Sequence, residues 1–223
     1  EKADNYILNA IVNHALYNYD RSIKKKNKVT NKISLEDLIN EMSESNIDFD
    51  DNYKGIKIIT VGRLSKEKGQ DLAIKTLAKL KKDRYDVKWY CIGEGNSRQE
   101  FEQLIKEYNL ENDFLLLGAT SNPYPYIKSA DIYVQTSRHE GYCLTLAEAK
   151  VLKKPIVTTN FIGAYEQIEN NENGIIVSCN EDDLAEGIRK LIDNKEICNK
   201  FSDKLKKIKI DTTKEVNKLF RVI

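Results

Sequence analysis

The sequence predicts an α/β protein built on a doubly wound parallel sheet. Short apolar segments of strand length alternate with longer segments whose apolar residues have helical spacing. The apolar segments are hydrophobic at nearly every position, as expected for a parallel sheet that helices cover on both faces. Glycines and charged residues follow several of these segments, and in such sheets ligands bind at the carboxyl ends of the strands.

The elements alternate regularly after residue 54. Strands are predicted at residues 56–61, 87–92, 114–117, 131–136, 155–158 and 174–177. Helices are predicted over residues 72–80, 101–108, a short turn opened by Pro123, 144–152, 184–192, 196–208 and a last stretch to Phe220. Right-handed crossovers between parallel strands bring the loops that follow the strands to one edge of the sheet.

The first 53 residues precede this alternation. An apolar stripe over residues 4–18 predicts one helix, and Ser34 is a suitable N-cap for a second, short helix. The basic run between them, residues 21–28, has two open interpretations: a solvated linker, or a contact with phosphate or membrane. We expect residues 1–53 to be a helical remnant of another half of the protein, or a linker. Residues 54–223 would form the main domain with its C-terminal helices.

Composition excludes several classes of function. Of the 223 residues, 40% are hydrophobic and 32% are charged, which is typical of a globular protein in water. The net charge of +1 gives no reason to expect nucleic acid as a partner. No apolar run has transmembrane length and no signal-peptide pattern opens the chain, so we expect a cytoplasmic protein. The four cysteines lack the paired spacing of a metal site, and we expect no metal.

The stretch Ser137–Leu152 has the clearest signs of a binding site. It passes from the end of a strand through a turn at Gly141 into a helix. Glycine permits unusual backbone dihedrals and the close approach of a ligand. The first amides of the helix, near Cys143, Leu144 and Thr145, have no acceptors within the helix and suit a phosphate. This stretch therefore predicts an anion site.

Acidic side chains accompany this turn. Glu140 lies in the loop, and Glu148 lies about one turn into the helix. Because a phosphate repels a carboxylate, we expect both to face the hydroxyls of a sugar or a ribose. The alternative is that both are solvated surface glutamates, and their spacing alone does not decide. His139 is a candidate ligand contact, but the sequence shows no partner that would make it a general base.

Two cations follow the first strand. Arg63 offers a planar fork for phosphate oxygens and Lys68 a mobile point charge. Gly62 and Gly69 let the backbone approach a ligand. These residues lie on the same sheet edge as the helix start near residue 144, which predicts a clamp for a diphosphate. The alternative is a pair of surface cations with solvated heads.

The glycine loop Gly93-Glu94-Gly95 follows the second strand. It has part of a dinucleotide-binding motif, but the third glycine is missing and the loop does not follow the first strand of the domain. We expect it instead to let a base or a phosphate come near. The sequence has no P-loop and no nucleophile elbow.

A series of short segments occurs in an order typical of one family. They are Val61–Leu64 with Lys68–Gly69, Gly93–Gly95, Leu117–Gly118, Tyr126–Asp131, Ser137–Gly141 with Glu148–Ala149, Pro155–Thr158, Gly163–Glu166 and Asn173–Gly174. Over about residues 54–193 the chain resembles the C-terminal, donor-binding half of GT-B glycosyltransferases of the retaining group 1 class, family 4. The resemblance implies a Rossmann-like sheet that is one half of a GT-B fold. It also implies sugar transfer, with retention, from a nucleotide diphosphate sugar to a glycan or lipid-linked acceptor, as in polysaccharide biosynthesis.

The resemblance implies roles for individual residues. Arg63 and Lys68 would bind the diphosphate and stabilise the leaving group, and Glu140, the third catalytic residue, would bind hydroxyls of the donor sugar. Glu148 would bind the ribose diol. The other donor-binding residues would be Gly62, Gly93, Gly95, Gly118, Ala119, His139, Gly141, Tyr142, Cys143, Leu144 and Thr145. No metal or cofactor is implied, and a UDP-sugar is the favoured donor, although the sequence leaves the base open.

Departures from the family pattern affect these expectations. The chain has Tyr142 and Cys143 where family members commonly have Phe and Gly, so a Cβ would narrow the amide turn. Ala164 replaces a second glycine, which would trim the sugar pocket. The acceptor site would lie in an N-terminal half that residues 1–53 are too few to build. We therefore expect this chain to bind donor without efficient transfer. Peripheral association of the full-length protein with the inner face of the membrane is open.

Three other functions are open at this point. A nucleotide-sugar epimerase can share the GT-B fold. A nicotinamide-binding domain can share the sheet, although the incomplete glycine motif argues against it. A non-catalytic interaction module would keep the fold without the site, and the presence of Arg63, Lys68, Glu140 and Glu148 argues against that reading.

Overall fold

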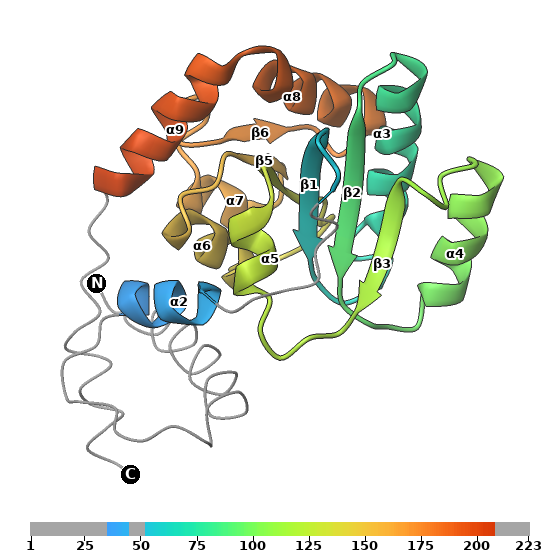
Figure 1. Cartoon of the computed structure of the whole chain (residues 1–223), viewed down its shortest axis with the longest axis horizontal. Coiled ribbons are helices and arrows are strands. Elements are labelled where there is room, and N and C mark those ends of the chain that lie inside the picture. The colour runs from blue at the N-terminus through green and yellow to red at the C-terminus, as the bar shows by residue number, and fades with distance from the viewer. Residues whose placement is uncertain (1–34, 45–51, 208–223) are drawn as a thin grey trace, which may run out of the picture.

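The computed structural model of the chain describes residues 35–44 and 52–207 (Figure 1). The helix predicted over residues 4–18, the basic run at 21–28 and the last stretch to Phe220 lie outside the described residues. Within the described ranges, no helix combines the length and the apolar character needed to cross a membrane. The division of the chain before residue 54 stays a prediction.

A six-stranded parallel sheet forms the centre of the molecule, which confirms the predicted fold class. Its strands are β1 (Ile56–Val61), β2 (Val87–Ile92), β3 (Phe114–Gly118), β4 (Ile132–Gln135), β5 (Ile156–Thr159) and β6 (Ile175–Val177). The strand order is β3-β2-β1-β4-β5-β6. The chain builds outward from β1 to β3 and then crosses to β4, so the order reverses between β1 and β4. This position is the topological switch point, where doubly wound sheets bind ligands.

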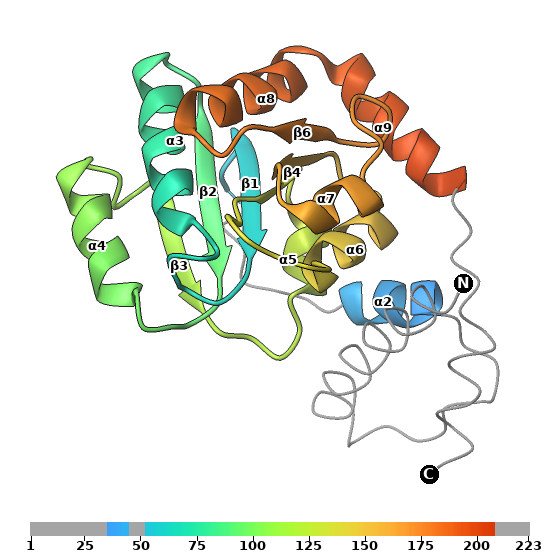
Figure 2. The same cartoon turned by 180° about the vertical axis from the view of Figure 1, so that it is seen from behind.

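Helices pack on both faces of the sheet (Figure 1, Figure 2). One layer contains α3 (Gln70–Lys82), α4 (Arg98–Glu107), α8 (Glu181–Asp193) and α9 (Lys195–Lys207), and the other contains α2 (Leu35–Ser43), α5 (Tyr124–Ser129), α6 (Leu144–Val151) and α7 (Ile162–Gln167). Because successive strand residues point to opposite faces, Ile58 belongs to the first layer's core and Ile59 to the second's. This two-sided burial explains why the strands are apolar at nearly every position.

One described helix was not predicted. α7 has only six residues, too few for a helical period to show in the sequence. The short helix after Ser34 is confirmed as α2, where Ile39 and Met42 are buried in the same core as α5. The side-chain amide of Asn122 donates to the carbonyl oxygen of Met42 at 2.9 Å, which ties α2 to the loop before α5. Cys91 is buried in β2, as predicted.

Candidate functional site

Two loops meet at the switch point. Residues 62–69 connect β1 to α3, and residues 136–143 connect β4 to α6. β1 and β4 are adjacent parallel strands, with Ile59 opposite Tyr133, so their carboxyl ends lie side by side. The predicted cations lie on the first loop and Glu140 lies on the second. The topology therefore brings together residues that are about seventy positions apart.

Lys68 and Glu140 form an ion pair across these loops. Their side chains are 23% and 8% exposed, so both charges are largely withdrawn from water. Burial lowers the pKa of Lys68, and the nearby guanidinium of Arg63 lowers it further. The carboxylate of Glu140 supplies the compensating charge that a buried ammonium needs. Arg63 itself is exposed at the same edge.

The two glycines of the first loop have different uses. Gly69 is left-handed, with φ of 71°, and a Cβ there would lie 2.1 Å from the carbonyl oxygen of Thr136. We expected Gly69 to let the backbone approach a ligand, and in the structure it lets the backbone approach the β4 loop. At Gly62 a Cβ would meet its nearest neighbour at 3.8 Å, so protein packing does not require a glycine there.

The turn before α6 lacks the unusual dihedral that was expected at Gly141, while the approach of a ligand to it stays a prediction. Gly141 is not among the residues with positive φ, and a Cβ there would meet nothing within 4 Å, so neither its conformation nor its packing requires glycine. Packing instead requires Gly163 on α7, where a Cβ would lie 1.5 Å from the carbonyl oxygen of Gly141. α7 thus lies directly against the loop that carries Glu140.

Cys143 precedes α6, and its side chain is buried in the core. Its sulfur lies 3.4 Å from Oγ1 of Thr145, and burial raises the pKa of the thiol. The side chain therefore contributes to the core, while its effect on the width or geometry of the amide turn stays a prediction. Ala164 is fully buried in the same core, so its methyl group also contributes to packing.

Glu148 has a different environment from Glu140. It is fully buried on α6, and the hydroxyl of Tyr124 on α5 donates to its Oε1 at 3.1 Å. Neither glutamate is a solvated surface residue, which was the alternative interpretation of the pair. Glu148 faces α5, however, whereas Glu140 faces a cation at the switch point.

The glycine loop after β2 packs against the β1 loop. Gly93 has φ of 147°, and a Cβ there would lie 2.0 Å from the carbonyl oxygen of Gly62. At Gly95 a Cβ would lie 2.3 Å from the carbonyl oxygen of Leu64. These glycines allow protein backbones to meet, a role that the sequence did not indicate, and the approach of a base or phosphate to them stays a prediction. Gly118, with φ of 81°, accepts from the backbone N–H of Gly93 at 2.8 Å and extends the same edge.

The remaining predicted site residues lie around the loops 62–69 and 136–143. Ala119 and His139 are exposed, and Tyr142, Leu144 and Thr145 are half-buried. Together with the residues above, they lie at the carboxyl ends of β1 to β4. The exception is Glu148, which lies beneath this edge.

Sequence reasoning missed the polar residues that hold the site together. Arg138 lies within the segment Ser137–Gly141, but its carboxylate partner, Asp71, lies 67 positions earlier and has no local sequence signature. Gln135 is buried at the end of β4, where it accepts from the hydroxyl of Tyr133 at 2.7 Å and donates to Ser137 at 2.8 Å. A polar residue inside an apolar strand was the signal that could have identified Gln135, because a buried amide needs partners.

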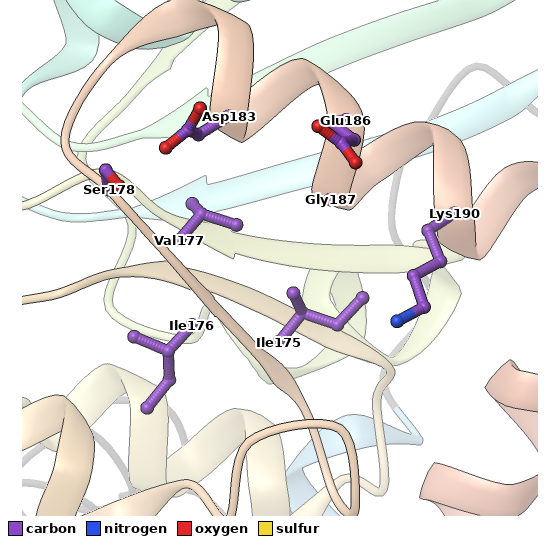
Figure 3. A pocket seen from close by; sticks show the side chains of 8 residues that line it. All are labelled: Ile175, Ile176, Val177, Ser178, Asp183, Glu186, Gly187 and Lys190. Carbon is purple, nitrogen blue, oxygen red and sulfur yellow. The ribbon is translucent and has the colours of Figure 1, made fainter.

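A cavity of about 340 Å³ lies away from these residues, between β6 and α8 (Figure 3). It is lined by Ile175, Ile176, Val177, Ser178, Asp183, Glu186, Gly187 and Lys190, none of which is a predicted site residue. The candidate site thus rests on the geometry of the switch point and not on this cavity. Among the described residues, no group of three or more His, Cys, Asp or Glu side chains is placed to hold a metal ion.

Together, the fold and these side chains define a class of protein. A doubly wound sheet with an arginine, a lysine and a glutamate at its switch point suits a ligand that carries both phosphate and hydroxyl groups. The family model described as "Glycosyl transferases group 1" matches residues 41–208, and the chain belongs to this family.

The relatives are glycosyltransferases. The N-acetylgalactosamine-N,N'-diacetylbacillosaminyl-diphospho-undecaprenol 4-alpha-N-acetylgalactosaminyltransferase of Campylobacter jejuni is 32% identical over 85% of this chain and 50% of its own length. The poly(ribitol-phosphate) alpha-N-acetylglucosaminyltransferase of Staphylococcus aureus is 28% identical over 82% of this chain and 41% of its own length. A crystal structure of S. aureus TarM with fondaparinux, alpha-GlcNAc-glycerol and UDP matches with a TM-score of 0.66 and 28% identity, over 75% of this chain and 35% of that one. The chain spans half or less of the length of these relatives.

Proposed function

We propose that this chain is the donor-binding half of a retaining group 1 glycosyltransferase. The observation that carries the proposal is the Lys68–Glu140 ion pair at the switch point, with Arg63 exposed beside it. The two cations suit a diphosphate, and the carboxylate suits sugar hydroxyls. One cluster thus matches both parts of a nucleotide diphosphate sugar.

The ion pair gives a sequence of events for donor binding. An entering diphosphate competes with Glu140 for the ammonium of Lys68, since it carries more negative charge than one carboxylate. Glu140 then accepts a hydrogen bond from a hydroxyl of the sugar. As the bond to the sugar breaks, negative charge grows on the diphosphate, and cations that are already in place stabilise it without reorganisation. The backbone amides of Leu144 and Thr145, at the start of α6, add partial positive charge.

Glu148 is proposed to accept the ribose diol. Its burial and its hydrogen bond from Tyr124 mean that the carboxylate must become accessible before it can bind ribose. The reaction uses no metal in this proposal, and the residues named above supply the charge that a metal would otherwise provide.

The activity of the whole protein is a further part of the proposal. The names of both relatives specify alpha linkages, which are the outcome of retention when the donor sugar is itself α-linked. One name specifies a lipid-linked diphosphate acceptor and the other a polymer, and we propose an acceptor of one of these kinds. Its site would lie in a half that this chain does not supply, so the chain alone would transfer little sugar. The enzyme would act in the cytoplasm, at the inner face of the membrane for a lipid-linked acceptor. A UDP-sugar is the proposed donor, since UDP is bound in the TarM structure.

A thermal-shift panel with UDP, GDP, ADP and NAD tests the proposal. A ligand at about a hundred times its dissociation constant adds roughly 2.7 kcal/mol of stability. For a domain of this size, the melting temperature should rise by roughly 5–10 °C with one nucleoside diphosphate. A rise with NAD alone would overturn the donor-site assignment and revive the nicotinamide alternative. A nucleotide-sugar epimerase is not favoured, because the relatives are glycosyltransferases.

A further inference from the structure

Three consecutive carbonyl oxygens of the β1 loop accept hydrogen bonds from one short segment of the β4 loop. Oγ1 of Thr136 donates to the carbonyl of Lys68 at 2.8 Å. The backbone N–H of Arg138 donates to Glu67 at 2.8 Å, and its guanidinium donates to Lys66 at 2.5 Å. The backbone that carries Lys68 is therefore fixed to the segment that leads into Glu140.

The guanidinium of Arg138 has a second partner at the start of α3. It donates to both carboxylate oxygens of Asp71, at 2.8 and 2.7 Å. Burial is the largest single influence and would raise the pKa of Asp71, but the hydrogen bonds and the charge of Arg138, with smaller contributions from the backbone and Lys75, together hold this pKa below its ordinary value. Bidentate pairs of this kind fix direction as well as distance. Arg138 thus joins the β1 loop, the first turn of α3 and the β4 loop.

We propose that Arg138 and Asp71 are positioning residues for the donor diphosphate: they hold the ammonium of Lys68 opposite Glu140. Neither residue needs to touch the donor. The proposal rests on the donor-binding function proposed above, and it adds the residues that hold the ammonium of Lys68 in position. Without this clamp, the β1 loop keeps its internal hydrogen bonds, such as Lys68 N–H to Ser65 at 3.0 Å, and the hydrogen bonds from Thr136 and from the backbone N–H of Arg138. It loses the guanidinium that ties the carbonyl of Lys66 to the start of α3.

The geometry requires arginine at this position. One guanidinium reaches the carbonyl of Lys66 and both oxygens of Asp71 at once, because its N–H groups form a rigid planar fork. A lysine carries the same charge, but its ammonium is a compact group without this planar fork. Arg138→Lys should therefore retain part of the function that Arg138→Gln removes.

A matched control exists at the other end of α3. Arg189 donates to the carboxylate of Asp83, the C-cap of α3, at 2.6 Å. The side chains of Arg189 and Arg138 are 32% and 35% exposed, whereas Asp83 is 47% exposed and Asp71 is 24% exposed. Arg189→Gln thus removes another arginine–aspartate pair of α3, with a single hydrogen bond and no connection to the β1 loop.

The experiment measures affinity for UDP and for uridine by calorimetry in the unmodified chain and in four variants: Arg138→Gln, Arg138→Lys, Asp71→Asn and Arg189→Gln. We expect Arg138→Gln and Asp71→Asn to weaken UDP binding about tenfold and to leave uridine binding unchanged, since misplacement affects only the diphosphate contact. Arg138→Lys should lie between, and Arg189→Gln should match the unmodified chain. A uniform loss for both ligands would identify a merely structural pair and overturn the proposal.

The outcomes also separate the two proposals. If the unmodified chain binds UDP and both Arg138→Gln and Asp71→Asn bind it equally well, the clamp is refuted and the donor site stands. If the unmodified chain binds no nucleoside diphosphate, both proposals fail. Should Arg138→Gln not fold, Asp71→Asn breaks the same pair from the other side and keeps the test decisive.

Discussion

The loop after β1 has two neighbours at the carboxyl edge, and it is joined to them by different means. Side chains join it to the β4 loop, through the Lys68–Glu140 ion pair and the hydrogen bonds of Thr136 and Arg138. At the β2 loop the contact is between backbones, because Gly93 and Gly95 have no side chains to keep them apart. The sequence has glycines and charges in both places, but the ion pairs differ: Lys68–Glu140 at the β1–β4 junction is 23% and 8% exposed, whereas Lys66 pairs with Glu100 of α4 at 76% and 54% exposure.

This difference shows how a glycine next to a strand should be interpreted. Such a glycine admits either a ligand or a neighbouring backbone, and sequence alone does not separate the two. The space around the glycine separates the two cases. A Cβ at Gly93 would lie 2.0 Å from a carbonyl oxygen, whereas a Cβ at Gly62 would have no neighbour closer than 3.8 Å. The glycines of this edge therefore contribute to stability, whereas ligand binding is proposed to depend on its charged side chains.

Gly93→Ala should break the glycine-packed junction and have the largest effect. Both the backbone dihedral and the clash with Gly62 oppose a side chain, so we expect a loss of about 3 kcal/mol or more in the free energy of unfolding. Gly62→Ala is the control and should change it by less than about 0.5 kcal/mol. Urea denaturation measures both values. Equal effects from the two substitutions would contradict the distinction between these glycines.

A second comparison concerns the buried lysines at opposite edges of the sheet. Lys68 faces a carboxylate, whereas Nζ of Lys154, at the amino edge, donates to the carbonyl oxygen of Ala130 at 2.6 Å. Burial lowers the pKa of Lys154 to about 8. Since the unfolded chain keeps the ordinary pKa near 10.5, it binds more protons than the folded chain between about pH 8 and 10.5, so stability rises with pH across this window.

Lys154→Met should remove that rise. After a discount for partial exposure, the unmodified chain should gain about 2 kcal/mol more than the variant between pH 7 and pH 10. Denaturation curves of both proteins at the two pH values give the difference. Parallel pH dependence in the two proteins would show that Lys154 is ordinarily solvated.

The two glutamates give the third and smallest expected effect. Glu140→Gln should weaken binding of a UDP-sugar relative to UDP by about fivefold, or about 1 kcal/mol, because its proposed partner is the sugar. UDP binding itself should not weaken, because the substitution removes the carboxylate that competes for Lys68. Glu148→Gln should weaken UDP and the UDP-sugar alike, because its proposed partner is the ribose. Competition calorimetry distinguishes these patterns. An exchange of the two patterns between the variants would mean that the roles are assigned the wrong way round.

The fold was predictable because its signal is local. Each strand from β1 to β6 is an apolar run that needs both faces covered, and each longer helix has its own apolar period. α7 escaped prediction because six residues carry no period. The cluster of Arg63, Lys68 and Glu140 at one edge was also predictable, since the carboxyl ends of parallel strands share an edge.

The details of the site were less accessible, because they depend on contacts between distant segments. Nothing near Arg138 in the sequence points to Asp71, and nothing near Glu148 indicates that α5 covers it. The packing around Gly141 was hidden for the same reason. Its neighbour Gly163, 22 positions later, is the glycine that the packing requires.

The central claim is that Lys68 and Arg63 bind the diphosphate of a nucleotide donor at the switch point. The most direct measurement is calorimetric titration of UDP into the unmodified chain, the double variant Arg63→Ala/Lys68→Ala, and Lys66→Ala. Lys66 is the matched control, a cation of the same loop whose side chain is 76% exposed. The account predicts that the double variant loses about a hundredfold in affinity, or about 2.8 kcal/mol, while Lys66→Ala binds as the unmodified chain does. Equal UDP affinity in all three proteins would contradict it.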